Sequence, residues 1–168
     1  VYSAANRIEE AISHYQKALA IQPDYLDARF NLGKAFQGLG RLDEALASYK
    51  MVMSLNPAFA DAHNRAGIVH GARGQWIEAI VSFQRALSIK PDFAEAYSNL
   101  GKALIGQGKL DEALDYCRKA LSLNPNLIDA HSNLGNALKE QGKLDEALAS
   151  YQSALSLNPD FADAHNNA

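Results

Sequence analysis

The sequence is poor in the residues that hold small folds together through covalent or metal bonds. Its 168 residues include one cysteine, Cys117, which excludes an intramolecular disulfide and a cysteine-based zinc site. No apolar run approaches the ~18 residues that span a bilayer, so we expect no membrane partner. Sixteen basic and nineteen acidic residues give a formal net charge of -3. Because nucleic-acid binding needs an excess of positive charge, we expect no nucleic-acid partner.

The first residues lack two common features of a complete chain. Val1 to Ser3 include no initiator methionine, and no charged segment followed by an apolar one comes after them. We therefore interpret the sequence as part of a longer protein.

Proline is scarce, and its placement reveals an internal repeat. Five prolines occur, and each successive pair is separated by 34 residues. They are Pro23, Pro57, Pro91, Pro125 and Pro159. We interpret 1–168 as a single domain of repeats. Its units are a partial repeat at 1–25, full repeats at 26–59, 60–93, 94–127 and 128–161, and a partial repeat at 162–168.

Each repeat contains two apolar blocks with helical spacing. In 26–59 the pattern predicts a first helix over 27–39 and a second over 42–55, with images every 34 residues. Gly40 suits the left-handed residue that ends the first helix, and Pro57 follows the second. We therefore predict an all-α fold, an α-solenoid of helix-turn-helix repeats.

The register of the repeat also makes two local predictions. Gly33 lies inside a first helix, where glycine costs ~1 kcal/mol relative to alanine, so we expect a close backbone approach with Ala45 as its facing partner. Val1 and Tyr2 correspond to Ala35 and Phe36. We therefore expect the chain to begin midway along a first helix.

The repeat motif resembles a known family. Leu32-Gly33, Ala45, Tyr49 and Pro57 match the pattern of the tetratricopeptide repeat, a helix-turn-helix unit of 34 residues. The resemblance extends over the whole chain and implies a right-handed α-solenoid. It implies a concave groove that binds a protein or an extended peptide, and it implies a module that is not itself an enzyme.

Motifs for catalysis are weak. Gly108-Lys109 lacks the earlier glycine and the following serine or threonine of a phosphate-binding loop. Cys117 occupies a position that holds an aromatic residue in the other repeats, so we expect it to be a small buried hydrophobe. We therefore expect no catalytic residue and no cofactor.

The repeated histidines are the only candidate metal ligands. His63, His131 and His165 lie in different repeats, ~10 Å or more apart, whereas zinc bonds its ligands at ~2 Å. We expect their rings to pack against the neighbouring repeat and to bind no metal.

One polar position recurs on the face predicted to line the groove. It holds Asn31, Arg65, Asn99, Asn133 and Asn167. An amide can donate and accept, which suits gripping an extended peptide backbone. The repeat arm of O-linked N-acetylglucosamine transferases is similar in carrying such an asparagine ladder. The alternative is that each ladder residue pairs with the acidic residue four positions earlier, an interaction worth ~0.2–0.5 kcal/mol.

The candidate peptide-binding residues lie on this face of the first helices. They are Asn31, Lys34, Asn64, Arg65, Asn99, Lys102, Asn133 and Asn136. Repeat 60–93 differs most from the others, because it carries Arg65, Ile68, Gly71 and Trp76. We expect Arg65 to pin a ligand carboxylate, the alternative being an internal pair with Asp61.

These patterns leave three functions open. The first is a protein-protein interaction module that binds an extended segment in the groove. The second is the substrate-recruiting arm of a larger glycosyltransferase. The third is a self-assembling scaffold, in which 162–168 docks head-to-tail near residues 1–15 of another copy through uncapped ends.

Overall fold

The computed structural model describes residues 2–159, with side chains described from Ala5 onward. Over these residues the chain forms nine helices and no strand. The helices are α1 (Tyr2–Ile21), α2 (Leu26–Gly38), α3 (Leu42–Leu55), α4 (Ala60–Ala72), α5 (Trp76–Ile89), α6 (Ala94–Gly106), α7 (Leu110–Leu123), α8 (Ile128–Glu140) and α9 (Leu144–Leu157). In the four full repeats the predicted helices are confirmed to within about a residue at each end.

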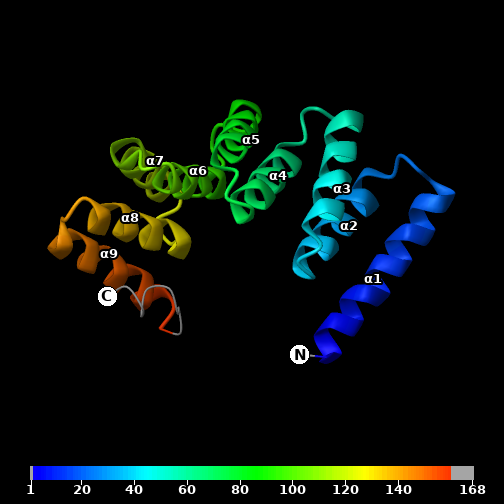
Figure 1. Cartoon of the computed structure of the whole chain (residues 1–168), viewed down its shortest axis with the longest axis horizontal. Coiled ribbons are helices and arrows are strands. Elements are labelled where there is room, and N and C mark those ends of the chain that lie inside the picture. Colours follow the sequence, from blue (N-terminus) through cyan, green and yellow to red (C-terminus); the bar gives the residue numbers. More distant parts are fainter. Residues whose placement is uncertain (1, 160–168) are drawn as a thin grey trace.

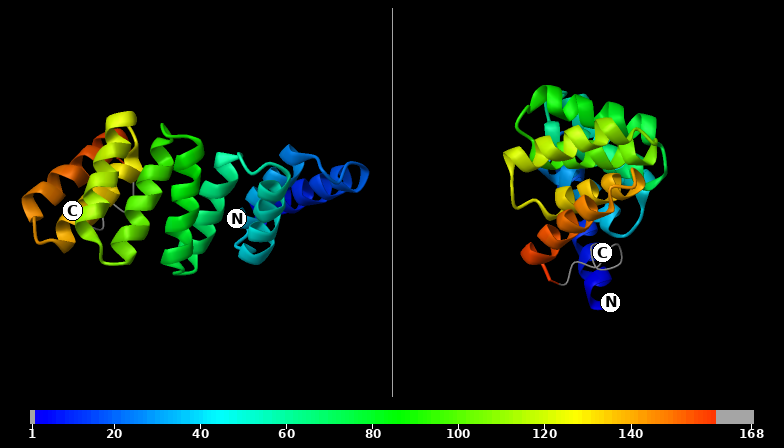
Figure 2. Two further views of the ribbon diagram at one scale, coloured as in Figure 1. Left: turned by 90° about the horizontal axis from the view of Figure 1, so that it is seen from above. Right: turned by 90° about the vertical axis from the view of Figure 1, so that its left-hand side faces the viewer.

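The helix pairs follow one another along an arch, with α4 and α6 on its inner side and α5 and α7 on its outer side (Figure 1). Seen from above, the helices lie side by side in a row (Figure 2). Each helix contacts the next one along the chain, and α4 also contacts α6, as α6 contacts α8. The first helices α4, α6 and α8 therefore form a continuous inner layer.

A glycine in the left-handed conformation ends each first helix. After α2, Gly40 has φ +71°. The N–H of Arg41 donates to the carbonyl of Phe36 at 2.9 Å, and the N–H of Gly40 donates to that of Gln37 at 3.0 Å. These bonds satisfy carbonyl groups that the helix end would leave unpaired, and they fix the angle at which α3 returns.

The expected start midway along a first helix is wrong. Residues Tyr2 to Ile21 form one continuous helix, α1, with no turn inside it. The position equivalent to Gly40 is Asn6, and no residue other than glycine takes a positive φ in the described chain. Without the glycine the left-handed turn is costly, so the helix continues.

The nearest neighbours of the glycines inside the first helices are side chains, and at Gly101 the expected backbone approach is present as well. A Cβ placed on Gly33 would lie 2.7 Å from Cε1 of the Tyr49 ring, and one on Gly67 would lie 2.6 Å from Cε1 of Phe83. At Gly33 the three nearest atoms all belong to the Tyr49 ring, so this ring, and not the expected Ala45, is the nearest neighbour. At Gly101, where Cys117 replaces the ring, the carbonyl oxygen of Ala113 does come within 3.3 Å of such a Cβ.

Cys117 is confirmed as a buried hydrophobe, because its side chain is 0% exposed. Burial raises the pKa of its thiol to about 12. The thiol is therefore protonated at neutral pH, and it is not a candidate nucleophile.

Two of the repeated histidines bond to the end of the preceding repeat. Nε2 of His63 donates to the carbonyl of Pro57 at 3.1 Å, and Nε2 of His131 donates to that of Pro125 at 2.9 Å. Arg29 makes the equivalent bond to Pro23 at 2.8 Å. These side chains hold the loop before their own helix, which contains the last residues of the preceding repeat. His165 lies outside the described residues.

Candidate functional site

Four hollows lie along the inner layer of helices. The N-terminal hollow, of about 510 Å³, lies between α1 and α2 around Asn31 and Lys34. The acidic hollow, of about 320 Å³, lies around Arg65 and is lined mainly from α4 and α6. The Trp76 socket, of about 180 Å³, lies between α4, α5 and α6. The C-terminal hollow, of about 480 Å³, lies around Asn133 and Asn136.

Three of the hollows form one continuous groove, whereas the N-terminal hollow lies on the same inner face but shares no lining residue with them. Asn99 lines both the acidic hollow and the Trp76 socket. Lys102 lines both the Trp76 socket and the C-terminal hollow. Because α6 carries both residues, it is the central wall of the groove.

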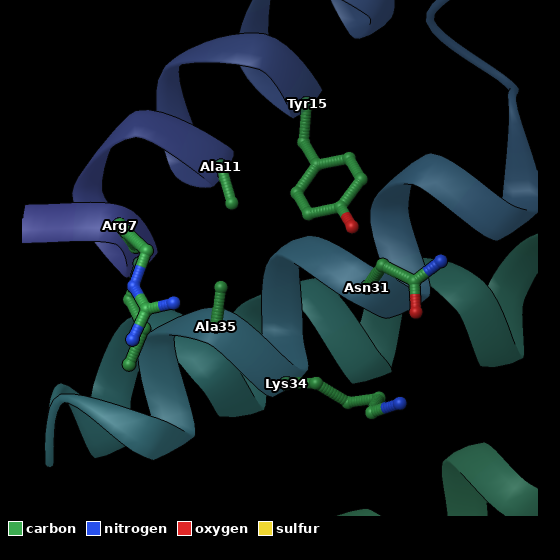
Figure 3. A pocket seen from close by; sticks show the side chains of 7 residues that line it. Arg7, Ala11, Tyr15, Asn31, Lys34 and Ala35 are labelled. Carbon is green, nitrogen blue, oxygen red and sulfur yellow. The ribbon is translucent and has the colours of Figure 1, made fainter. Parts of the chain in front are cut away.

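The N-terminal hollow is the first part of this surface along the chain. Figure 3 shows the Tyr15 ring reaching from α1 toward α2 with its hydroxyl on the side of Asn31, while Arg7 lies at the opposite end. Lys34 is exposed there, and its ammonium lies 5.9 Å from the centre of the Phe30 ring. Two basic side chains line this hollow and no acidic one does.

The acidic hollow has the opposite charge. Three carboxylates line it, those of Asp61, Glu95 and Asp129, against one guanidinium, that of Arg65. Arg65 makes no ion pair with Asp61 or with any other carboxylate in the described part of the chain. The internal pair considered for Arg65 is therefore absent.

All eight residues predicted from the sequence line one of these hollows. Two of them are buried: Asn64 is 6% exposed and Asn133 is 7% exposed. Asn136 is half-buried, and its amide oxygen accepts a hydrogen bond from the Tyr151 hydroxyl at 2.8 Å. Asn167 lies outside the described residues.

Two of the ladder amides, those of Asn99 and Asn133, are bonded to the preceding first helix and not to the acidic residue four positions earlier. Nδ2 of Asn99 donates to Oδ1 of Asn64 at 3.1 Å. Nδ2 of Asn133 donates to the carbonyl of Ser98 at 3.2 Å and to its hydroxyl at 3.0 Å. Within residues 5–159 no hydrogen bond joins a ladder residue to its acidic neighbour. These bonds fix the amide planes and leave the Asn99 and Asn133 amide oxygens without a protein partner in that range.

Sequence reasoning missed the partner of this second amide. Ser98 is 1% exposed and belongs to a polar column that holds Asn64, Ser98 and Ser132 in successive repeats. The recurrence of small polar residues at one position per repeat was the available signal. The sequence alone does not show that Asn64 and Ser98 of this column each bond to the ladder residue 35 positions later, in the next repeat.

No group of three or more His, Cys, Asp or Glu side chains from the described residues could hold a metal ion. Among the same residues, no helix is long and apolar enough to cross a membrane.

Paired helices of constant length, stacked in register, define an α-solenoid repeat protein. The family model "TPR repeat" matches residues 1–40, 71–108 and 135–168, and further tetratricopeptide repeat models match 26–59, 94–127 and 116–149. The chain belongs to the tetratricopeptide repeat family. The matching models describe repeats and not a catalytic domain. No curated protein matches the chain.

Solved structures show the same architecture. The chain is 28% identical to MamA, with a TM-score of 0.79 over 95% of this chain and 94% of that one. YrrB, described as a TPR protein with an unusual peptide-binding site, is 28% identical, with a TM-score of 0.72 over 92% and 79%. The first TPR of Spaghetti (RPAP3), solved with the HSP90 peptide SRMEEVD, is 27% identical, with a TM-score of 0.61 over 64% and 85%. The predicted all-α solenoid is confirmed.

Proposed function

We propose that the chain is a protein-interaction module that binds an extended peptide segment in the groove of its inner helix layer. Two of the similar structures are described as a peptide-binding protein and as a complex with a peptide, which supports this class of function. The observation that carries the proposal is the pair of ladder amides at Asn99 and Asn133, held in place from behind by the preceding first helices.

The Asn99 and Asn133 amides suit a peptide backbone because each keeps its oxygen available as a hydrogen-bond acceptor for the ligand. The amide nitrogens of Asn99 and Asn133 are used inside the protein, so their amide oxygens are left to accept N–H groups. Packed helices lie about 8–10 Å apart, and an extended chain advances ~3.4 Å per residue. Successive ladder amides can therefore meet roughly every third residue of one extended peptide.

The sign of the charged side chains changes along the inner face of the helix layer. It is positive around Lys34, negative around the three carboxylates of the acidic hollow, and positive again around Lys102. The carboxylates around Arg65 repel a ligand carboxylate, which argues against the anchoring role expected for this residue from the sequence. We propose instead that a ligand with separated acidic and basic side chains complements the groove.

The test is a selection from a random displayed peptide library on the immobilised chain, followed by affinity measurements on purified variants. Asn99→Ala and Asn133→Ala are each expected to lower the affinity of the selected peptides about five- to tenfold, because each removes a hydrogen bond worth ~1 kcal/mol. Gln84→Ala is the matched control, since this exposed amide lies on the outer helix α5.

Two results would contradict the proposed function. One is a selection that enriches no peptide. The other is a set of peptides whose affinity falls as much with Gln84→Ala as with Asn99→Ala, which would place the contact outside the groove.

A further inference from the structure

We propose that the Trp76 socket binds one aliphatic side chain of the ligand, of the size of leucine or methionine, from a peptide position next to an acidic residue. This inference rests on the proposed function and adds the side-chain chemistry that the groove selects. The socket carries the apolar specificity, and Lys102 at its rim carries the charge specificity.

The socket exists because one first helix lacks a side chain at a key position. Gly71 stands where α2, α6 and α8 carry Gln37, Ile105 and Lys139. The missing side chain leaves a hollow of about 180 Å³ whose lining includes Ile68, Trp76 and Phe83. Pockets that take a whole small molecule are usually about 300–1,000 Å³, so this hollow suits a single side chain.

The walls of the socket are held in place by close packing. The Trp76 ring lies against α6 so closely that a Cβ on Gly106 would be 2.6 Å from its Cε2 atom. On the other side, Cζ3 of the same ring lies 3.7 Å from the position of a Cβ on Gly71. The floor is Phe83, which is 2% exposed. A preformed apolar socket loses little entropy on binding, as expected of an interface hot spot.

The polar groups at the rim of the socket indicate which kind of ligand residue lies next to the aliphatic one. Lys102 is exposed and forms no ion pair with any residue from 5 to 159. No carboxylate lines the socket, so the ammonium is available to an acidic side chain of the ligand. Asn99, also at the rim, offers its amide oxygen to the ligand backbone between these two side chains.

The chain contains a built-in reporter for this test. Trp76 is its one tryptophan, and its ring is half-buried in the socket wall. Filling the socket removes water from the ring, so we expect the fluorescence emission to shift to shorter wavelength. Library-selected peptides are the probe, each compared with a version in which the aliphatic residue is replaced by asparagine.

Two variants of the protein test the socket and its rim separately. Gly71→Leu fills the socket from within and is expected to weaken the selected peptides about tenfold or more. The matched control is Gly38→Leu, the same change in the last turn of α2, where a Cβ would lie 3.8 Å from Ile8 and which does not line the Trp76 socket. Lys102→Gln is expected to remove the preference for an acidic neighbour and to keep the preference for the aliphatic residue.

The outcomes separate this inference from the proposed function. An aliphatic-acidic pair in the selected peptides, a shift of the Trp76 emission and a loss confined to Gly71→Leu would support the socket. If Asn99→Ala weakens the selected peptides but Gly71→Leu does not, and the emission of Trp76 is unchanged, the groove binds peptides and the socket inference is wrong. If no peptide is enriched, the proposed function fails and the inference fails with it.

Discussion

At the residue scale, the helix contacts depend on positions where no side chain can be added. Gly33 faces the ring of Tyr49, which is 0% exposed and whose hydroxyl donates to Gln37 at 2.8 Å. The ring is therefore fixed on both sides. The sequence predicted a close approach at Gly33, but it did not reveal that the approaching group is an aromatic ring, because spacing along one helix does not show the rotamer of a residue on another.

Gly33→Ala is expected to lower the free energy of unfolding by about 1–3 kcal/mol, because the new Cβ would lie 2.7 Å from the ring. Gly38→Ala, in the same helix, is the control. Its Cβ has an ordinary contact at 3.8 Å, so the higher helix propensity of alanine should raise stability by up to ~1 kcal/mol. Denaturant titration measures both, and a shift of the same sign in the two variants would refute the packing described here.

Cys117 gives the protein a dependence on alkaline pH. Burial raises the pKa of its thiol from the usual 9.0 to about 12. Below pH 9 both folded and unfolded states keep the proton, and the contribution to stability is complete. Between pH 9 and 12 the unfolded state loses the proton while the folded state keeps it, so the free energy of unfolding falls by ~1.4 kcal/mol per pH unit.

Denaturant titrations at several pH values between 8 and 11 test this dependence. Cys117→Ala should show a shallower decline, whereas Tyr49, whose pKa burial raises to about 12, contributes equally to both proteins. Equal slopes in the two proteins, or a native thiol that titrates near pH 9 by ultraviolet absorbance, would contradict the burial of this side chain.

At the element scale, the turn glycines decide whether two helices form or one. The sequence identified them correctly because a glycine that ends a helix has a local cause, the left-handed conformation. The continuous helix α1 was not predicted, because the 34-residue register places a turn at Asn6 although no glycine is present there to end a helix. Periodicity predicts where an element would repeat, and the local residues determine whether it does.

Gly108→Ala tests the turn between α6 and α7. Gly108 has φ +74°, and a Cβ there would meet no atom within 4 Å. The cost is therefore conformational alone, and we expect a loss of about 1–2 kcal/mol in the free energy of unfolding. Gly108→Asn should cost less, because asparagine visits the left-handed region more readily. An alanine variant as stable as the parent would show that the turn does not need this conformation.

At the scale of the whole molecule, stacking brings together residues that lie one repeat apart. The sequence predicted which face of the first helices lines the groove, because that face follows from helical spacing. The Trp76 socket and the cluster of carboxylates around Arg65 could not be predicted in the same way. Both depend on how far one first helix is displaced against the next.

The most direct test of the account is an NMR map of a library-selected peptide on the isotope-labelled chain. Binding in the groove predicts amide shifts concentrated on the inner helices α4, α6 and α8, with Asn99, Lys102 and Asn133 among the largest, and few shifts on the outer helices α5 and α7 apart from Trp76 (Figure 1). Shifts concentrated on the outer faces of α5, α7 and α9, with the ladder residues unchanged, would contradict the central claim that the inner face binds the peptide.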